Sequence, residues 1–501
     1  MNKLSLRDTI WKGYVLILLI NIGVFFALFA SSTQIDHAQG EMAGEPTQTT
    51  ILLQSRLTQG KHFTGGDIAG ASGLACFEIS MSLSFGESFK TDWIQTLPEK
   101  DFIVRQKIFN LKPGTIYYYR LLYGLNKEHI SVGNTCSFKT LPDTSALTRV
   151  SFVVVTGMNY DKFHYGWPWK NRKPYSGADK LLGYPALEAI LKLKPDFFVG
   201  TGDNVYYDEL GVRGVAKTQS ELRRKWHEQF TQKRYIDLFA QIPTFWEKDD
   251  HDYRYNDCDT TGTRLPLHEL GKNTFLEQLP VIDPENPDAV TYRIYRVGKL
   301  IQIWLLEGRD YRSPNSMPDG PQKSIWGEVQ KDWLKKTLLA STATFKLMIS
   351  PTPMIGPDDG YKSDNHANPK GFKHEGDAFF SWLGANGFLN KHFYLVCGDR
   401  HWQYHSTHPS GFEEFSCGAL VENNSRLGRA PGDPESTDPQ ALVKQIYTQK
   451  EASAGFLKIS AIPGNQDEPH KLLFDFYDEY GNLLYTCQKT AVRNEENTSN
   501  L

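Results

Sequence analysis

Closely spaced cysteines are missing from the chain. Its 501 residues include only six cysteines, and no two of them form a CxxC pair. We therefore expect no zinc finger. Two of the six, Cys76 and Cys136, fall within one small predicted domain, where they form either a disulfide, if the chain is exported, or two buried free thiols.

A strong net charge is also missing. The chain has 55 lysines and arginines against 58 aspartates and glutamates, which gives a formal net charge of −3. A nucleic-acid binder usually carries a clear basic excess, so we expect no nucleic-acid partner. Internal repeats and low-complexity tracts are absent as well. The composition is 40% hydrophobic and 13% aromatic, and 501 residues are enough for two or more well-packed domains.

Long apolar runs are absent except at the N-terminus. Residues 13–30 (GYVLILLINIGVFFALFA) form an 18-residue run in which Asn21 is the only strongly polar side chain. This length suits a long signal peptide or a membrane span, so we predict that residues 1–32 are a signal peptide or an N-terminal membrane anchor. The basic residues lie before the run, which places the rest of the chain outside the cytoplasm, in the periplasm or on the outer face of the cytoplasmic membrane. An uncleaved segment would make the membrane a partner.

The chain then changes character twice. Residues 33–48 are small and polar and are predicted as a linker. Residues 49–143 hold short alternating runs such as CFEISMSL and TIYYYRLLYG, which are typical of an all-β sandwich. Within them, Leu111–Leu121 (LKPGTIYYYRL) is similar to the tyrosine corner of fibronectin type III-like domains.

Residues 147–490 form the larger predicted domain. Val150–Val155 (VSFVVV) reads as a buried strand, and Leu182–Lys194 (LGYPALEAILKLK) has helical spacing. A similar alternation continues to the strand-like run HKLLFDFYD at residues 470–478. Continuously apolar strands separated by helices predict an α/β layered core.

Polar clusters follow four of the predicted strands, where α/β folds usually carry their active groups. Each cluster alone has an ordinary explanation: the aspartates cap turns or form a solvated acidic loop, and the arginines pair with neighbouring acids. Together, carboxylates and imidazoles suit divalent or trivalent cations, and two such ions can clamp a phosphoryl group. The clusters, in chain order, are FFVGTGDNVYYDE (197–209), TFWEKDDHDYRYND (244–257), WLLEGRDYRSP (304–314) and LVCGDRHWQYH (395–405).

The chain resembles the PhoD-type alkaline phosphatases, within the calcineurin-like metallophosphoesterases, in five segments: GDNVYYDE, WEKDDHDYRYND, LLEGRDYRSP, WLKKTLLASTATFKLMISPTPM and CGDRHW. The resemblance covers residues 150–476 and the preceding β-domain. It implies an α/β layered metallophosphoesterase sandwich, residues 147–490, preceded by a small all-β fibronectin type III-like domain, residues 49–143. It also implies hydrolysis of phosphate mono- or diesters by two or more metal ions, Ca²⁺ and/or Fe³⁺, with Mn²⁺ and Zn²⁺ left open.

The resemblance implies a role for each of seven side chains. It makes His251 a proton donor to the substrate or leaving group, and Arg309 a clamp on the phosphoryl oxygens. The other five are implied metal ligands: Asp203 as a bridging ligand, Tyr206 as a ferric-iron ligand, Asp250, Asp399 and His401.

The chain departs from the PhoD-type pattern after its first predicted strand. Those enzymes carry a Ser-Cys pair there, whose thiolate binds iron, whereas this chain has TGMN, Thr156 to Asn159. A thioether is a poor ligand for a hard ferric ion, so a different pair of metals is an open alternative. Further ligand candidates are Asn159 or Asp161 after the first strand, and Asp364, Asn365 or His366 in YKSDNHANP (361–369).

Two other functions compete with hydrolysis of phosphate esters, outside the cytoplasm, by a phosphatase of this type. One is a surface-anchored protein whose degenerate phosphatase domain binds a metal or an anion. The other is a diesterase for phospholipid or wall polymer. In that case the aromatic stretch HYGWPWKNRKPY (164–175) either lines an extended substrate groove or is a packed loop.

Overall fold

The computed structural model describes residues 35–63, 65–167, 170–212, 214–283, 286 and 289–491. The predicted signal peptide or anchor, residues 1–32, lies outside these ranges. Among the described residues, no helix combines the length and the apolar character that a bilayer crossing requires.

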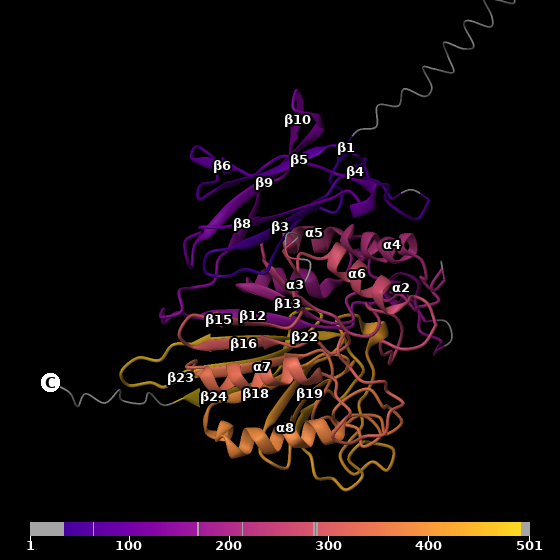
Figure 1. Cartoon of the computed structure of the whole chain (residues 1–501), viewed down its shortest axis with the longest axis vertical. Helices are drawn as coiled ribbons and strands as arrows, with labels where there is room; N and C mark the ends of the chain where they lie inside the picture. The colour runs from indigo at the N-terminus through magenta and orange to yellow at the C-terminus, as the bar shows by residue number, and fades with distance from the viewer. Residues whose placement is uncertain are drawn as a thin grey trace, which may run out of the picture.

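Two large mixed sheets lie face to face at the centre of the molecule (Figure 1). In each, the central strands are parallel and the outer strands antiparallel. The nine-stranded sheet has the order β24 (Leu483–Ala491), β23 (His470–Asp478), β22 (Gly455–Ile462), β12 (Val150–Val155), β13 (Phe197–Thr201), β14 (Thr244–Glu247), β2 (Glu41–Gly44), β3 (Ile51–Arg56) and β8 (Ile103–Ile108). The seven-stranded sheet has the order β15 (Arg293–Val297), β16 (Ile301–Leu305), β17 (Phe345–Ser350), β18 (Phe393–Cys397), β20 (Glu413–Cys417), β19 (Gln403–Thr407) and β21 (Lys444–Thr448).

Helices cover the outer face of each sheet, which gives a four-layer α/β sandwich (Figure 1). Strand β12 shows why the sequence reads as continuously apolar: Val153 and Val155 pack toward the helices, while Phe152 and Val154 pack between the sheets. The predicted layered core is therefore confirmed. Over the nine-stranded sheet lie α2 (Tyr160–Tyr165), α3 (Pro185–Leu193), α4 (Gln219–Phe230), α5 (Lys233–Phe239) and α6 (His268–Gln278), and over the seven-stranded sheet α7 (Gly327–Ala340) and α8 (Lys373–Ala385).

The predicted N-terminal β-sandwich is also present. A six-stranded sheet packs against β2, β3 and β8 through a core that includes Leu53, Phe77 and Tyr119. The hydroxyl of Tyr117 accepts a hydrogen bond of 2.8 Å from the backbone N–H of Lys112, which is the contact that defines a tyrosine corner. The strands of this sheet are β5 (Leu74–Ser80), β6 (Ser88–Lys90), β7 (Ile94–Gln95), β9 (Ile116–Asn126), β10 (His129–Val132) and β11 (Cys136–Lys139), and a separate pair is formed by β1 (Ile35–Asp36) and β4 (Thr58–Gln59).

The predicted linker, residues 33–48, is wrong. Strand β2 within it is fully buried and pairs with β14 on one side and β3 on the other. One continuous sheet therefore runs from the N-terminal region into the layered core. The small residues that suggested a linker are needed for close packing, because a Cβ on Gly44 would lie 2.5 Å from the carbonyl oxygen of Pro280.

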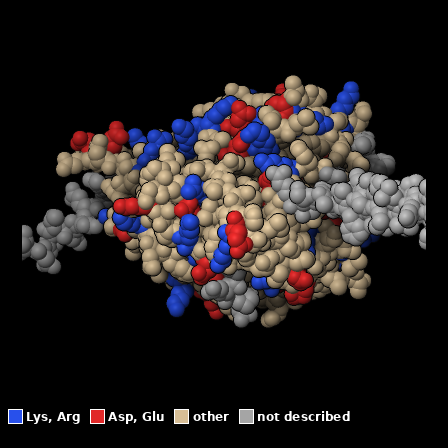
Figure 2. Space-filling view, turned by 90° about the horizontal axis from the view of Figure 1, so that it is seen from above, with Lys and Arg blue, Asp and Glu red and all other residues tan. Residues whose placement is uncertain are grey.

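All six cysteines are buried free thiols, including Cys76 and Cys136. On the molecular surface, acidic and basic side chains of the described residues are intermixed on the face above the N-terminal β region (Figure 2). Neither feature adds a functional site to this end of the molecule.

The carboxyl ends of the central parallel strands of both sheets meet at one edge. Gly398, just after β18, lies so close to the end of β13 that a Cβ there would collide with the carbonyl oxygen of Thr201. Residues that follow β13 and β14 in one sheet, and β17 and β18 in the other, are therefore brought into one region.

Candidate functional site

Three predicted ligands converge between the two sheets. The carboxylate oxygen Oδ2 of Asp203 accepts a hydrogen bond of 2.8 Å from the hydroxyl of Tyr206. The same oxygen lies 3.0 Å from Nε2 of His401, which in turn is 3.3 Å from the Tyr206 hydroxyl. Asp203 follows β13 and His401 follows β18, so residues about 200 apart in the chain meet here, as predicted.

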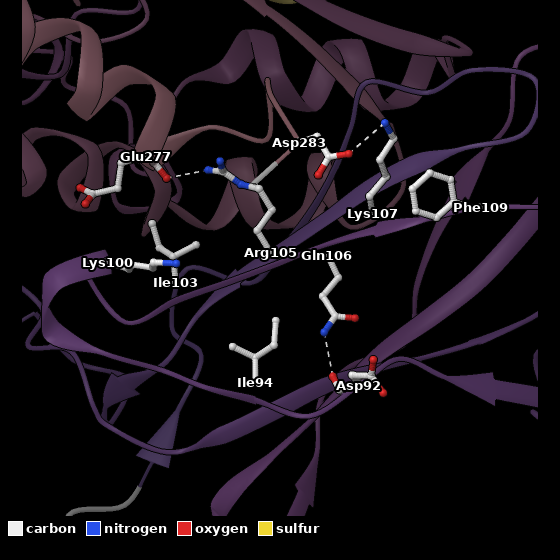
Figure 3. Close-up of a pocket in the computed structure, with 10 residues that line it drawn as sticks. All are labelled: Asp92, Ile94, Lys100, Ile103, Arg105, Gln106, Lys107, Phe109, Glu277 and Asp283. Carbon is white, nitrogen blue, oxygen red and sulfur yellow. Dashed lines mark hydrogen bonds and ion pairs between the residues drawn. The ribbon is translucent and has the colours of Figure 1, made fainter. Parts of the chain in front are cut away.

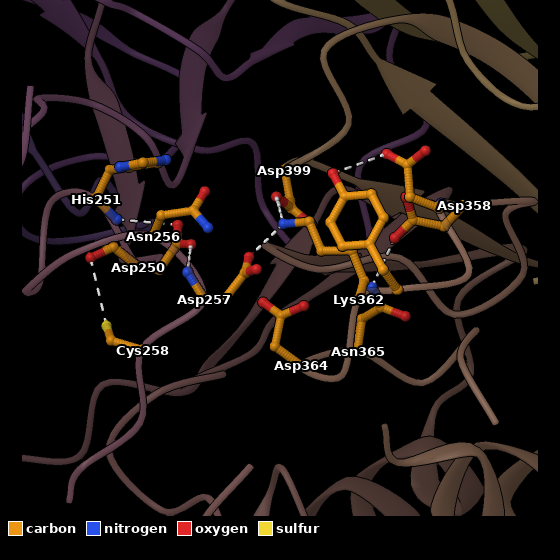
Figure 4. Close-up of polar contacts among 12 residues, drawn as sticks. Asp250, His251, Asn256, Asp257, Cys258, Asp358, Lys362, Asp364, Asn365 and Asp399 are labelled. Carbon is orange, nitrogen blue, oxygen red and sulfur yellow. Dashed lines mark hydrogen bonds and ion pairs between the residues drawn. The ribbon is translucent and has the colours of Figure 1, made fainter. Parts of the chain in front are cut away.

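Asp250 extends this group into a cluster of carboxylates (Figure 4). One donor atom from each of Asp203, Asp250 and His251 lies within 4.8 Å of the others, and the same holds for Asp250, Asp257 and Asp364. Asp250 belongs to both groups. Two adjacent sets of oxygen and nitrogen donors that share a carboxylate are an arrangement suited to two neighbouring cations.

The backbone places these carboxylates in a conformation that few side chains adopt. Asp203 has φ of 54° and Asp399 has φ of 53°, in the left-handed region where aspartate is more tolerated than most residues. Gly202, which precedes Asp203, has φ of 76°, and a Cβ there would collide with Asp249. Glycine is therefore required before Asp203, because the ends of β13 and β14 approach each other closely at this point.

Several carboxylate oxygens in the cluster lack partners. Oδ1 of Asp203, Oδ2 of Asp249 and Oδ1 of Asp364 are buried, and none has a hydrogen-bond partner among the described residues. A buried carboxylate oxygen without a partner costs free energy that a bound cation would offset. The residues present therefore fit metal ions.

Burial and neighbouring carboxylates raise the pKa values of the carboxyl groups in the cluster, whereas nearby cationic side chains lower them. Burial, together with the carboxylates of Asp250 and Asp399, raises the pKa of Asp203 to about 7, although His251 opposes the shift. Burial, together with Asp364, also raises the pKa of Asp257 to about 6. Such carboxylates are stabilised in the ionised form by a cation.

Asp399 differs from Asp203, because two cationic side chains already neutralise it. Its carboxylate pairs with Arg400. It also lies 4.0 Å from Nζ of Lys362 (Figure 4). Burial opposes ionisation, but Arg400 and Lys362 hold the pKa of Asp399 well below its usual range. The structure brings Asp399 to the site as predicted. Because Asp399 is already paired, its carboxylate is less available to a metal ion than that of Asp203.

His251 is held by a carboxylate from the loop that follows β13. Its Nδ1 lies 2.6 Å from Oδ1 of Asp208, and its ring lies against that of Tyr206, with centroids 4.4 Å apart. Burial opposes protonation, but Asp208 and Asp250 raise the pKa of His251 well above its usual range. With Nδ1 engaged, Nε2 is the nitrogen left to face a substrate.

A cavity of about 540 Å³ opens over the cluster and contains four of the predicted residues in its lining: Tyr206, His251, Asp399 and His401. Trp167, Lys170 and Arg172 also line it, so the aromatic stretch 164–175 contributes to a groove rather than only to packing. The remaining cationic groups in the lining are Lys162, Lys362 and Arg426.

The role predicted for Arg309 is wrong. Arg309 is fully buried, and its guanidinium donates to Asp249 at 2.7 Å, to the carbonyl of Cys258 at 2.8 Å and to Asp364 at 3.3 Å. Its donors are consumed inside the protein, so it positions Asp249 and Asp364 instead of clamping phosphoryl oxygens. The sequence pattern could not distinguish these roles, because both place an arginine at a strand end.

The additional candidate after the first strand, Asn159, is also wrong as a ligand. Its side-chain oxygen accepts from the backbone N–H of Lys162 at 2.9 Å and caps α2, and its amide donates to Glu209 at 3.1 Å. The alternative residue there, Asp161, pairs with Lys225. Met158 is buried in the core, where its sulfur accepts from the hydroxyl of Tyr235.

In the segment after β17, Asp364 belongs to the carboxylate cluster, whereas the candidates Asn365 and His366 contact other residues and stay predictions as ligands. Asn365 donates to Asp358 at 2.7 Å and accepts from Ala367 at 3.1 Å. His366 lies 3.0 Å from Glu375 and packs on Trp326. Residues 364–367 form a tight turn, and the side chains of Asp364, Asn365 and His366 contact different parts of the protein.

The chain patterns missed several residues of the site. Asp208, Asp257, Lys162, Lys362 and Arg426 all contact or line it. Asp208 and Asp257 belong to the polar clusters at 197–209 and 244–257, and Lys362 is two residues before Asp364. Their closeness in sequence to the predicted ligands could therefore have identified them. No sequence signal indicated Arg426, because only the fold brings it to the site.

A second cavity, of about 580 Å³, lies beside β8 and is not a comparable site (Figure 3). Arg105 in its wall donates to the carbonyls of Leu276 and Glu277, and Lys107 pairs with Asp283 at 3.1 Å. These charged groups are satisfied by neighbouring residues. None of the predicted site residues lines this cavity.

Comparison with known proteins agrees with this location of the site. The family model of PhoD-like phosphatases matches residues 152–463, which is more than half of the chain and includes the whole cluster. Alkaline phosphatase D of Bacillus subtilis (strain 168) is 23% identical over 336 residues, covering 62% of this chain. The match covers 54% of that relative, so the chain spans about half the length of the curated relative it matches.

Two solved structures share the fold. A structure of PhoD has a TM-score of 0.69 at 17% identity, covering 91% of this chain and 93% of that one. A purple acid phosphatase from seeds of yellow lupin (Lupinus luteus) has a TM-score of 0.59 at 14% identity, covering 90% of this chain and 74% of that one. Taken with the family match, the layered fold and the carboxylate cluster at its strand ends place the chain in the PhoD-like phosphatase family.

Proposed function

We propose that the chain hydrolyses phosphate esters with two or more metal ions held by the carboxylate cluster. The observation that carries this proposal is the set of buried carboxylate oxygens at Asp203, Asp249 and Asp364 that have no partner among the described residues. Asp203 contacts Tyr206 and His401, which line the open cavity. Membership of a phosphatase family supports the reaction class.

The all-carboxylate set and the group formed by Asp203, Tyr206 and His401 differ in chemistry, which favours different ions. Asp250, Asp257 and Asp364 offer only carboxylate oxygens, the preference of Ca²⁺ and Mn²⁺. Asp203, Tyr206 and His401 offer oxygen and imidazole donors, which suit Fe³⁺ or Zn²⁺. When bound, such cations would neutralise charge on the phosphoryl group and make an attacking water more acidic.

The protein's own residues supply orientation and a proton. Asp208 fixes the imidazole of His251 through Nδ1, so that Nε2 can give a proton to the alcohol oxygen as the phosphorus–oxygen bond breaks. Lys362, between Asp257 and Asp399, holds both carboxylates in place. Arg309 does the same for Asp249 and Asp364.

Turnover of simple chromogenic esters tests this function. Purified protein, supplied with Ca²⁺, Mn²⁺, Zn²⁺ or Fe³⁺, is assayed on p-nitrophenyl phosphate and on bis(p-nitrophenyl) phosphate. We expect hydrolysis of at least one ester, and a fall in kcat/KM of more than about 100-fold in Asp250→Asn. The matched control, Asp467→Asn, changes the same side chain on an exposed loop and should keep its activity. Metal binding without turnover of either ester would instead favour a surface-anchored binding protein.

The protein also acts outside the cytoplasm in this proposal, because basic residues precede the apolar run at residues 13–30. Fractionation of cells that express the full chain checks this. We expect the protein in the periplasmic or membrane fraction, and recovery in the cytoplasmic fraction alone would contradict export.

A further inference from the structure

The lining of the active-site cavity carries more positive than negative charge. Two acidic side chains line it, Glu209 and Asp399, and both are paired with cationic groups. Five cationic side chains line it: Lys162, Lys170, Arg172, Lys362 and Arg426. Among the side chains that line the cavity, lysines and arginines therefore outnumber carboxylates, even without His251.

Three of the five cationic groups are committed to the protein. Lys362 pairs with Asp257, and Lys162 lies 3.0 Å from Glu209. Arg172 donates through one nitrogen to the backbone carbonyls of residues 422, 423 and 425, the last at 2.8 Å. These contacts join the segment around Trp167 and Arg172 to the segment around Arg426, so the two form one wall of the cavity.

The other two, Lys170 and Arg426, are available to a ligand. Lys170 is exposed, and its ammonium has no ion pair among the described residues; its contact there is the ring of Trp167 at 5.9 Å. Arg426 pairs through one nitrogen with Asp359, which also accepts from Arg429 at 2.7 Å. Arg429 has further acidic partners in Asp433 and Glu435. The pair with Asp359 uses one nitrogen of Arg426, whose side chain is 34% exposed, so its other N–H groups can still contact a ligand.

The position of Arg426 is fixed beside the catalytic groups. Its backbone N–H donates to the carbonyl of His401 at 2.9 Å, and its guanidinium lies 4.6 Å from the ring of Trp402. The cavity volume, about 540 Å³, lies in the range of pockets that hold whole small molecules, about 300–1,000 Å³. It therefore has room for the alcohol part of an ester as well as for the phosphoryl group.

We propose that Lys170 and Arg426 bind a second anionic group on the substrate, so that the preferred substrates are phosphate esters whose alcohol part carries a carboxylate or a further phosphate. The proposal rests on the hydrolytic function proposed above. The metal cluster takes the phosphoryl group that reacts, while the two side chains select the part of the molecule that does not react.

Substrates matched for size and reacting group test this selection. One series contains monoesters with an anionic, a neutral and a cationic alcohol: 3-phosphoglycerate, glycerol 1-phosphate and phosphocholine, followed by phosphate release. The other contains p-nitrophenyl diesters whose second alcohol is carboxyethyl, ethyl or choline, followed by nitrophenol release. We expect kcat/KM to fall from anionic to neutral to cationic by about 1.5-fold to fivefold per charge, the range for exposed ion pairs, mainly through KM and less so at high salt.

Two variants assign the preference to these residues. Arg426→Gln and Lys170→Gln should each lower kcat/KM more for the anionic substrate than for the neutral one, and the exposed Lys170 can be changed without disturbing the fold. Lys127→Gln, which removes the same charge from an exposed turn of the N-terminal β region, should leave the ranking unchanged. Equal kcat/KM across a series that the wild type hydrolyses, or a ranking that survives both variants, would overturn this inference. Failure to hydrolyse any ester in either series would instead overturn the hydrolytic function itself.

Discussion

Asp203 is the residue on which the geometry of the cluster depends most. One of its oxygens faces both Tyr206 and His401, and the other is buried without a partner among the described residues. Asp203 therefore contacts side chains that follow strands of both sheets. A change that keeps its shape but removes its charge is therefore informative.

The variant Asp203→Asn should lose bound metal and activity while keeping its fold. The amide is nearly isosteric but neutral, so it cannot offset the charge of a cation as the carboxylate does. We expect kcat/KM to fall by more than about 100-fold, with elemental analysis and circular dichroism as the two readouts. A variant that retains its full metal content and activity would contradict the assigned role.

His251 should behave differently, because its proposed role is proton donation. His251→Gln should keep the metal content of the wild type and lower kcat by about 10²- to 10⁴-fold, the usual contribution of a general acid. Asp208→Asn should act in the same direction with a smaller effect, since Asp208 only orients the imidazole. If His251→Gln protein instead loses metal in proportion to activity, His251 is a ligand.

For single residues, the sequence predicts well which polar residues follow the strands. It predicts poorly whether each side chain points into the site or into the protein. Asp203, Asp250 and His401 meet because their strands are central and parallel, which the apolar runs predict. Arg309 and Asn365 lie in other polar segments after strands, but they donate to buried carboxylates inside the protein. Only packing decides between these outcomes.

Among the elements, helix α4 is attached to the N-terminal β region by an unusual buried contact. Nδ1 of His227 lies 2.7 Å from Asp67, and its Nε2 lies 2.7 Å from Asp101, which also pairs with Arg56 at 3.0 Å. Burial opposes ionisation of Asp101, but His227 and Arg56 lower its pKa below the usual range.

His227→Ala should therefore lower stability and weaken its dependence on acid. A depressed carboxyl pKa stabilises the fold above the unfolded value, about 3.9, and that contribution disappears as pH falls through the folded pKa. Loss of one partner of a buried pair should cost about 3 kcal/mol near neutral pH. Thermal unfolding between pH 3 and 7 measures this, with the exposed His129→Ala as control. A constant difference from the wild type at every pH would contradict the linkage.

Helices and strands could be predicted where their hydrophobic patterns extend over enough residues. Strand β12 and helix α3 follow from a continuous apolar run and from helical spacing. Strand β2 did not, because its four residues, EMAG, are too few and too small to show alternation. Its pairing depends on β14, which is 200 residues away in the sequence.

For the whole molecule, β2 makes the N-terminal β region and the layered core one cooperative unit. The nine-stranded sheet passes through both regions, and β2 lies between β14 and β3. Separate domains connected by a linker would unfold independently, whereas a shared sheet couples them.

Calorimetry should accordingly record one unfolding transition for the full chain. Gly44→Ala should lower the midpoint of that single transition, because the new Cβ would clash with Pro280 and force the β2–β14 pair apart. Two resolved transitions, of which only one moves in Gly44→Ala protein, would show that the regions are independent.

The central claim is that carboxylates from both sheets share bound cations, and that these cations are required for ester hydrolysis. Elemental analysis of the full chain before and after chelation, with activity followed in parallel, tests it most directly. We predict two or more metal ions per chain, loss of metal and activity together on chelation, and recovery of both when metal is restored. Protein that hydrolyses phosphate esters at an undiminished rate after its last metal ion has been removed would contradict the account.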